Sequence, residues 1–252
     1  MTEITSPRVR VIDLETAGTG RFDVCEIGWQ DVELQADALW QVSESRGALF
    51  VNPGRGISAE TMAIHHIIDA DVAFAPFWKE VAFGVLKPTG GICALAAHRA
   101  AFEQRYCTPP LTGNARWICT WKCAMRLWPQ LASFSNQMLR YQRMPEGLVR
   151  EIGLPAHRAM PDAYVTAHHL RDMLNQVSLD QLLAWSREPG LLPRVPSGSS
   201  RGKTWDQLGS EMLEEFSQDR DPDIRFSATT ELRRRGEAAV IAPTPPAQGT
   251  LI

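Results

Sequence analysis

Two carboxylates end an apolar run near the start of the chain. Val9, Val11 and Ile12 have strand character, and Asp13 and Glu15 follow them before glycines interrupt the pattern. Because residues i and i+2 of a strand point to the same face, the two carboxylates are expected side by side. Adjacent anionic groups resist burial unless a cation joins them, and magnesium prefers hard oxygen ligands. The pattern indicates a metal-binding strand end or, taken alone, an edge strand with two solvated acids.

Three residues further along extend this pair into a candidate site. Glu103 follows a second apolar run, and Asp162 comes shortly after His157 at a predicted helix start. Four carboxylates from three segments, with one histidine, are the set that a two-metal phosphodiesterase needs. A histidine that is neutral near pH 7 can accept the proton of an attacking water. Each residue alone is equally compatible with a solvated surface position, but their combination favours catalysis.

The composition is that of an ordinary globular protein. The chain has 252 residues, of which 44% are hydrophobic and 22% charged, enough for one core and a small appendage. No apolar run is long enough to span a bilayer and no signal-peptide pattern occurs, so a cytoplasmic protein without membrane association is expected. The five cysteines include no C-x-x-C pair and indicate buried free thiols.

Basic residues gather around the candidate site. Residues 92–171 contain ten arginines and lysines against four acids, although the net charge of the whole chain is −3. This local excess suits a polyanionic substrate, and it is equally compatible with a set of solvated helix faces.

The residue pattern predicts an α/β fold with a mixed five-stranded sheet flanked by helices. Strands are expected at 8–14, 24–34, 48–51, 91–96 and 117–119, the first three as an antiparallel meander. Helices are expected after Ser58 and Pro76 and at 97–106, 120–128, 134–142, 161–176 and 178–186. The wholly apolar run at 91–96 predicts a central strand that is buried on both faces.

Changes in composition divide the chain into four parts. Residues 1–186 are expected to form the main domain, and residues 187–203, rich in Pro, Gly and Ser, to form a linker. Residues 204–235 predict two short amphipathic helices, a small module that docks on the main domain or on a protein partner. Residues 236–252 are rich in Ala, Pro and Thr, and this composition predicts a disordered tail.

The motifs resemble those of the DEDDh 3′–5′ exonucleases. Similarity to the three motifs of that family lies in Asp13-Leu-Glu15-Thr16, in Ala97-His98 through Phe102-Glu103, and in His157-x4-Asp162-Ala163. The stretches at 52–67 and 117–129 are most similar to the exodeoxyribonuclease X group. The resemblance covers residues 8–186, and the segment at 197–234 is similar to the small C-terminal module of the same group.

The resemblance implies a ribonuclease H-like exonuclease fold and hydrolysis of DNA from a free 3′ end, most simply on single-stranded DNA. It implies two Mg²⁺ ions, for which Mn²⁺ can substitute, held by Asp13, Glu15, Glu103 and Asp162. His157 would be the base that deprotonates the attacking water, and a nucleoside 5′-monophosphate would be released. The expected biological setting is DNA repair or proofreading.

The resemblance also implies substrate contacts. Thr16 and Ala17 would hold the terminal nucleotide, and His65 would lie along the pocket wall. The second motif departs from the family pattern His-Asn-x-x-Phe-Asp, because Arg99 replaces the amide and Glu103 replaces the aspartate. Two alternatives therefore remain open at this point: the same chemistry on RNA, and a catalytically impaired nucleic-acid-binding module.

Overall fold

The computed structural model describes residues 6–20 and 22–241, with side chains up to residue 236. The chain divides into two compact units, Met1–Glu188 and Pro189–Ile252. The first unit contains every residue of the predicted site. Within the described ranges, every helix is too short or too polar to span a bilayer.

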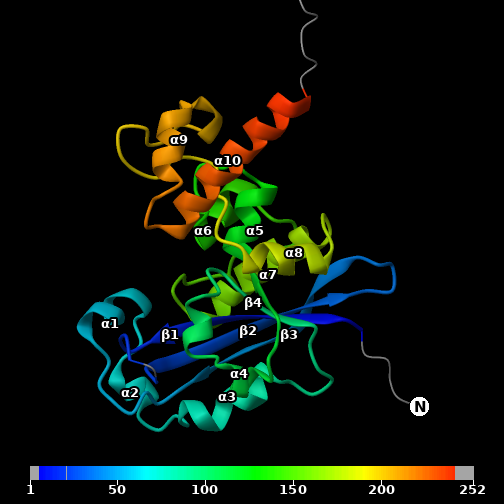
Figure 1. Cartoon of the computed structure of the whole chain (residues 1–252). Helices are drawn as coiled ribbons and strands as arrows, with labels where there is room; N and C mark the ends of the chain where they lie inside the picture. The colour runs from blue at the N-terminus through cyan, green and yellow to red at the C-terminus, as the bar shows by residue number, and fades with distance from the viewer. Residues whose placement is uncertain (1–5, 21, 242–252) are drawn as a thin grey trace, which may run out of the picture. The chain divides into compact units, whose positions relative to one another are not determined.

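The first unit is built on a five-stranded sheet with the strand order β3-β2-β1-β4-β5 (Figure 1). Its strands are β1 (Arg8–Thr16), β2 (Val24–Leu34), β3 (Trp40–Phe50), β4 (Ala94–Ala97) and β5 (Trp117–Cys119). The strands β1, β2 and β3 pair antiparallel, whereas β4 pairs with β1, and β5 with β4, in parallel. The predicted mixed sheet with an antiparallel meander is therefore confirmed.

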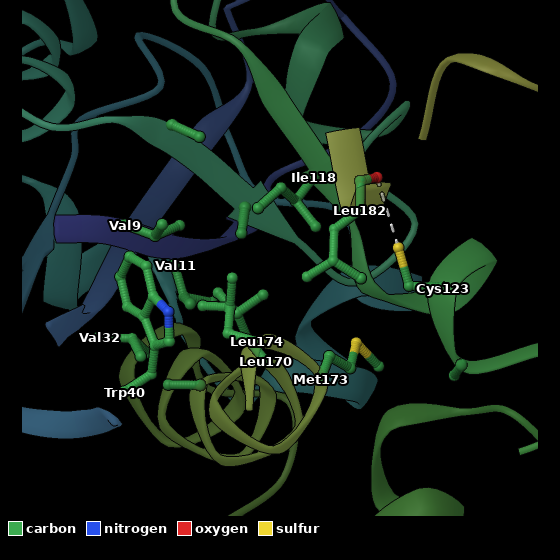
Figure 2. Packing of buried hydrophobic residues seen from close by; sticks show 14 of the residues in the cluster. Val9, Val11, Val32, Trp40, Ile118, Cys123, Leu170, Met173, Leu174 and Leu182 are labelled. Atoms are coloured by element: carbon green, nitrogen blue, oxygen red, sulfur yellow. Dashed lines mark hydrogen bonds between the residues drawn. The ribbon is translucent and has the colours of Figure 1, made fainter. Parts of the chain in front are cut away.

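Helices lie on both faces of this sheet. They are α1 (Ala59–His65), α2 (Asp69–Val72), α3 (Trp78–Leu86), α4 (Pro109–Thr112), α5 (Thr120–Leu127), α6 (Asn136–Arg143), α7 (Ala159–Leu174) and α8 (Leu179–Arg187). One apolar cluster joins Val9 and Val11 of β1 to α5, α6, α7 and α8, and Figure 2 shows part of its packing. A second cluster joins Ile12 and Leu14 of the same strand to α3. Alternation along β1 thus supplies both cores.

Two elements differ from their predictions. β3 begins at Trp40 and not at residue 48, because an edge strand with an exposed face needs no continuous apolar run. The helix predicted at 97–106 is a series of turns with one 3₁₀ helix, η1 (Glu103–Arg105). Arg99 explains this difference, because its φ of 65° is left-handed and cannot continue an α-helix.

The second unit has its own small core. It consists of η2 (Trp205–Gln207), α9 (Ser210–Phe216), α10 (Pro222–Ile241) and the segment that precedes them. Val195 and Trp205 are buried in this core, and the indole of Trp205 donates a 2.6 Å hydrogen bond to the carbonyl of Leu192. The stretch predicted as a linker therefore packs within this unit in large part. The predicted disordered tail also begins too early, since α10 continues to Ile241, and residues 242–252 lie outside the described ones.

Gly28 on β2 sets how closely α7 approaches the sheet. A Cβ atom at this position would lie 2.2 Å from the carbonyl carbon of Ala159 and 2.2 Å from the nitrogen of Met160. Only glycine permits this contact, because both neighbours are backbone atoms that have no rotamer with which to move away. Gly28 also pairs directly with Asp13 across the β1–β2 ladder, so α7 begins beside the carboxylate end of β1.

We expect Gly28→Ala to destabilise the protein by about 3 kcal/mol, near the upper end of the usual cost of overpacking. Gly84→Ala on α3 is the matched control, because a Cβ there meets no atom within 4 Å. That control should stabilise the protein by about 0.5–1 kcal/mol, since alanine favours a helix over glycine. Urea denaturation followed by circular dichroism measures both. Equal stability of Gly28→Ala and wild type would show that α7 does not sit against β2 as described.

Candidate active site

Alternation along β1 places Asp13 and Glu15 on the face that α7 covers. They continue the row of Val9 and Val11, which belongs to the apolar cluster on that face. Asp162 lies one turn into α7 and is buried. One carboxylate oxygen from each of Asp13, Glu15 and Asp162 lies within 4.8 Å of the other two. The structure thus brings three of the four predicted metal ligands together.

Glu103, the fourth predicted ligand, is buried at the start of η1 with only 3% of its surface exposed. Its Oε2 atom has no hydrogen-bond partner in the described protein. Glu103 lies outside the group of three, but it interacts with that group electrostatically. The charge of Glu103 raises the pKa of Asp13, and the charge of Glu15 raises the pKa of Glu103. A buried carboxylate oxygen without a partner is costly, and a cation beside it would remove that cost.

Burial shifts the protonation of the whole cluster. Burial raises the pKa of Asp13 well above its ordinary value, and the charges of Asp162, Glu15 and Glu103 raise it further. The pKa of Glu15 rises to about 8, mainly through burial and then through Asp162 and Glu26. Burial likewise raises the pKa of Glu103 to about 8. Carboxylates that resist ionisation together in this way fit a divalent cation, which supplies the missing positive charge.

Asp162 is held by the N-terminal turn of α6, which sequence reasoning missed. Gln137 donates from Nε2 to Asp162 Oδ1 at 2.7 Å, and Asn136 donates to the same oxygen at 3.3 Å. Thr166 donates to the amide oxygen of Asn136 at 3.1 Å and orients it. An Asn-Gln pair at a helix start is the only sequence signal, and it does not reveal which distant residue the pair contacts.

His157 lies beside this cluster, in the loop before α7. Its side chain is exposed, and its backbone has a left-handed φ of 60°. The backbone N–H of His157 donates to Asp162 Oδ2 at 2.6 Å, so the predicted base is tied directly to a predicted metal ligand. Both carboxylate oxygens of Asp162 therefore accept hydrogen bonds from the protein, Oδ1 from α6 and Oδ2 from His157.

An ion pair beneath Glu15 anchors the same loop. Glu26, which faces Glu15 across the ladder, accepts hydrogen bonds from Arg158 at 2.7 and 3.0 Å and from the Ala159 N–H at 2.9 Å. The Glu26 side chain is 4% exposed. Because Arg158 follows His157 directly, this pair limits where the imidazole can lie. Sequence reasoning missed this pair as well, since the two residues are far apart along the chain.

The three predicted substrate residues lie together at the end of β1. His65 is 2% exposed, and its Nδ1 accepts a hydrogen bond from the Ile67 N–H. The ring proton is therefore on Nε2, which lies 3.3 Å from the Thr16 carbonyl oxygen. The Ala17 N–H donates to the Asp23 carbonyl at 2.7 Å. The ring of His65 and the N–H of Ala17 are thus already bonded within the protein. Both residues shape the site by holding β1, and Thr16 keeps a partly exposed side chain.

Comparisons with known proteins agree with this geometry. No family model matches the sequence. Exodeoxyribonuclease 10 of Escherichia coli (strain K12) is 34% identical over 197 residues, which cover 77% of this chain and 82% of that protein. A solved structure of exonuclease X in complex with 5′ overhanging duplex DNA aligns with a TM-score of 0.57 at 32% identity, covering 71% of this chain and 99% of that one. A solved structure of E. coli exonuclease I in complex with a dA16 oligonucleotide aligns with a TM-score of 0.52 at 13% identity. The alignment covers 71% of this chain and 42% of exonuclease I, and it shows a shared fold.

The sheet and its carboxylate cluster define a ribonuclease H-like exonuclease fold. Within that class, the identity and the coverage of the relative show that the chain belongs to the exodeoxyribonuclease 10, or exonuclease X, family. The family predicted from the three motifs is therefore confirmed.

The raised pKa values predict a pH-dependent stability in the absence of metal. Glu15 and Glu103 have a pKa of about 8 in the folded protein against 4.5 ordinarily, so the stability that they contribute at low pH is lost as pH rises toward 8. Burial lowers the pKa of His98 to about 4, and such histidines destabilise the fold only below their ordinary pKa of 6.5. Between about pH 6.5 and 8.5 the carboxylates should therefore dominate.

We expect the Tm of EDTA-treated protein to fall across that window and a divalent cation to cancel most of the fall, because the cation binds the ionised carboxylates. Differential scanning fluorimetry with and without Mg²⁺ measures the effect. Glu103→Gln should show a shallower slope in EDTA, since it has one fewer group to ionise. A Tm that rises with pH in EDTA, or that does not change when Mg²⁺ is added, would contradict the raised pKa values of these carboxylates.

We expect Glu26→Gln to lower turnover about tenfold, the equivalent of one weakened charge-assisted hydrogen bond. The loss should appear in kcat more than in KM, because the ion pair positions the His157 loop and does not contact substrate. Glu33→Gln on the same strand is the matched control, as Glu33 is partly exposed and forms no ion pair among the described residues. Steady-state kinetics across pH measures both. Equal kcat values for the two variants would remove Glu26 from the positioning of the site.

Proposed function

We propose that this protein is a metal-dependent 3′–5′ exodeoxyribonuclease that releases nucleoside 5′-monophosphates from DNA 3′ ends. The observation that carries the proposal is the meeting of Asp13, Glu15 and Asp162 within 4.8 Å, beside the buried and unbonded Glu103. Its relatives support the substrate, because they are named exodeoxyribonuclease 10 and exonuclease X in complex with DNA. A cytoplasmic role in DNA repair or proofreading, and a protein partner for the second unit, belong to the same proposal.

We infer that the cation is Mg²⁺, bound as two ions and replaceable by Mn²⁺. All four candidate ligands are carboxylates, and hard oxygen ligands select magnesium or manganese over softer metals. Asp13, Glu15, Glu103 and Asp162 would hold the ions. Bound ions of this kind neutralise the phosphate and stabilise the charge that develops on the leaving oxygen.

The chain's own residues supply the proton transfer. The imidazole of His157 accepts a proton from the attacking water, whose oxygen forms a bond to the phosphorus of the terminal phosphodiester. The bond between that phosphorus and the 3′ oxygen of the preceding nucleotide breaks, leaving a new 3′ end and a nucleoside 5′-monophosphate. Asp162, fixed by α6, holds the backbone of His157 during this step. We assign the contact with the terminal nucleotide to Thr16, the last residue of β1.

We expect His157→Asn to lower the single-turnover rate by about 10²–10⁴-fold, the usual contribution of general base catalysis. Asparagine is the best replacement because it tolerates the left-handed backbone at this position. His66→Asn is a matched control, since His66 is also exposed and has a φ of 60°. That variant should cleave like wild type.

The measurement is cleavage of a 5′-labelled DNA oligomer and of an RNA oligomer of the same sequence, with Mg²⁺ and with Mn²⁺. Asp13→Asn, which removes a central ligand, should be nearly inactive and gives the baseline. If wild type cleaves the RNA oligomer and not the DNA oligomer, the substrate is RNA and the proposed DNA substrate is wrong. Wild-type activity equal to that of Asp13→Asn on both strands would favour a binding module without catalysis.

A further inference from the structure

A groove on the first unit is lined in part by the loop between β1 and β2 and by the start of α3. One part is a hollow of about 440 Å³ lined by Phe22, Phe77, Trp78 and Lys79, among others. The adjoining part, of about 270 Å³, is lined by Phe22, Trp78, Lys79, Arg105 and Tyr106. Because three lining residues are common to both parts, the two hollows form one continuous surface, which we call the aromatic groove.

Two large aromatic side chains are presented to solvent along the aromatic groove. Phe22 and Phe77 are each 54% exposed, although exposed phenylalanine rings are unfavourable in water. The position of Phe77 is fixed, since its N–H donates to the Glu80 carboxylate at 2.8 Å. Trp78 forms a buried wall, 4% exposed, and its indole donates to the Tyr106 carbonyl at 3.3 Å. The rings therefore stand on a rigid base.

Two cations flank these rings. Lys79 Nζ lies 5.6 Å from the centroid of the Phe22 ring, and the Arg105 guanidinium carbon lies 5.5 Å from that of Tyr106. Neither Lys79 nor Arg105 forms an ion pair among the described residues. The one acid in the groove, Glu80, is already used to accept the Phe77 N–H. Lys79 and Arg105 outnumber Glu80, so the aromatic groove offers rings together with a net positive charge.

Tyr106, which lines one part of the aromatic groove, lies three residues after Glu103 in the chain. The backbone N–H of Tyr106 donates to the Glu103 carbonyl at 3.0 Å, and burial raises the pKa of the Tyr106 hydroxyl while the nearby side chain of Thr16 lowers it. Glu103 is a proposed metal ligand and Thr16 a proposed substrate residue. The segment that carries Glu103 thus also carries a wall of the aromatic groove, which a strand with its 3′ end in the site could reach.

We propose that the aromatic groove binds a single-stranded stretch of the DNA substrate, with bases stacked on Phe22 and Phe77 and phosphates near Lys79 and Arg105. Exposed rings interleaved with cations are the combination that binds single strands regardless of sequence, because every base has a π-face and every linkage a charge. An apolar peptide would use the rings but leave both cations without a partner. The proposal rests on the proposed DNA substrate.

The test compares the binding of two oligothymidylates of different length by fluorescence anisotropy in EDTA. The longer has about 12 nucleotides and can fill the aromatic groove, whereas the shorter has about three and is confined to the carboxylate site. We expect Phe22→Ala and Phe77→Ala each to reduce the ratio of long- to short-oligomer affinity by about 5- to 100-fold, the range for one lost stacking contact. Phe83→Ala is the matched control, because Phe83 is 55% exposed on the same helix as Lys79 but lines neither hollow.

Salt dependence adds a second readout. Lys79→Gln should reduce the slope of log affinity against log salt by about 0.7, the value for one phosphate contact on a single strand. An unchanged affinity ratio in both phenylalanine variants, or an equal loss in Phe83→Ala, would overturn the proposal. Hydrolysis of the short oligomer by wild type with Mg²⁺ is measured in parallel. If wild type fails to cleave while the length-dependent loss persists, the proposed catalysis is wrong and the aromatic groove stands.

Discussion

Repulsion between clustered, partly or fully buried carboxylates is the constraint around which this site is built. Asp13, Glu15 and Asp162 are brought together by packing that their charges oppose, since Asp162 raises the pKa of both other residues and Glu15 raises that of Asp13. The opposing force comes from the apolar cluster under α7 and from the close contact of that helix with Gly28. When the carboxylates are ionised, the fold therefore holds an arrangement that a bound cation would make favourable.

The histidines that build the site differ from His157, whose side chain is exposed. His98 of the second motif is partly buried, and its two ring nitrogens lie 3.0 Å from the Thr120 hydroxyl and 2.8 Å from the Phe134 carbonyl oxygen. Burial lowers its pKa to about 4, so it stays neutral in the working range. His65 is buried, with both nitrogens bonded within the protein. His157 differs because its side chain is exposed while its backbone is bonded to Asp162. Exposure with a fixed backbone is what a base needs to exchange protons.

The sequence predicts those parts of the site that depend on local pattern. Alternation along β1 is enough to place Asp13 and Glu15 on one face, and the structure agrees. It could not predict the contacts of Gln137 or of Glu26, because each acts on a residue from another element. The prediction of a helix across the second motif was wrong because Arg99 has a left-handed backbone conformation, which the residue pattern does not indicate. The segment at 187–203 has the composition of a linker, but composition does not show that its few apolar residues find a small core.

The unusual second motif is explained by geometry as well as by charge. Arg99 turns away from any role as an amide substitute, since its guanidinium carbon lies 4.1 Å from the centroid of the Trp121 ring on α5. The left-handed turn at Arg99 replaces a helix by η1, and Glu103 is the first residue of that short element. A carboxylate carried on one more methylene has greater reach, and Glu103 needs it because it lies outside the group of three. Since its Oε2 makes no hydrogen bond, binding a metal breaks no existing interaction there. The proposed role of Glu103 as a fourth ligand therefore requires this longer side chain to be ordered, at a cost of about 0.5–1 kcal/mol in side-chain entropy.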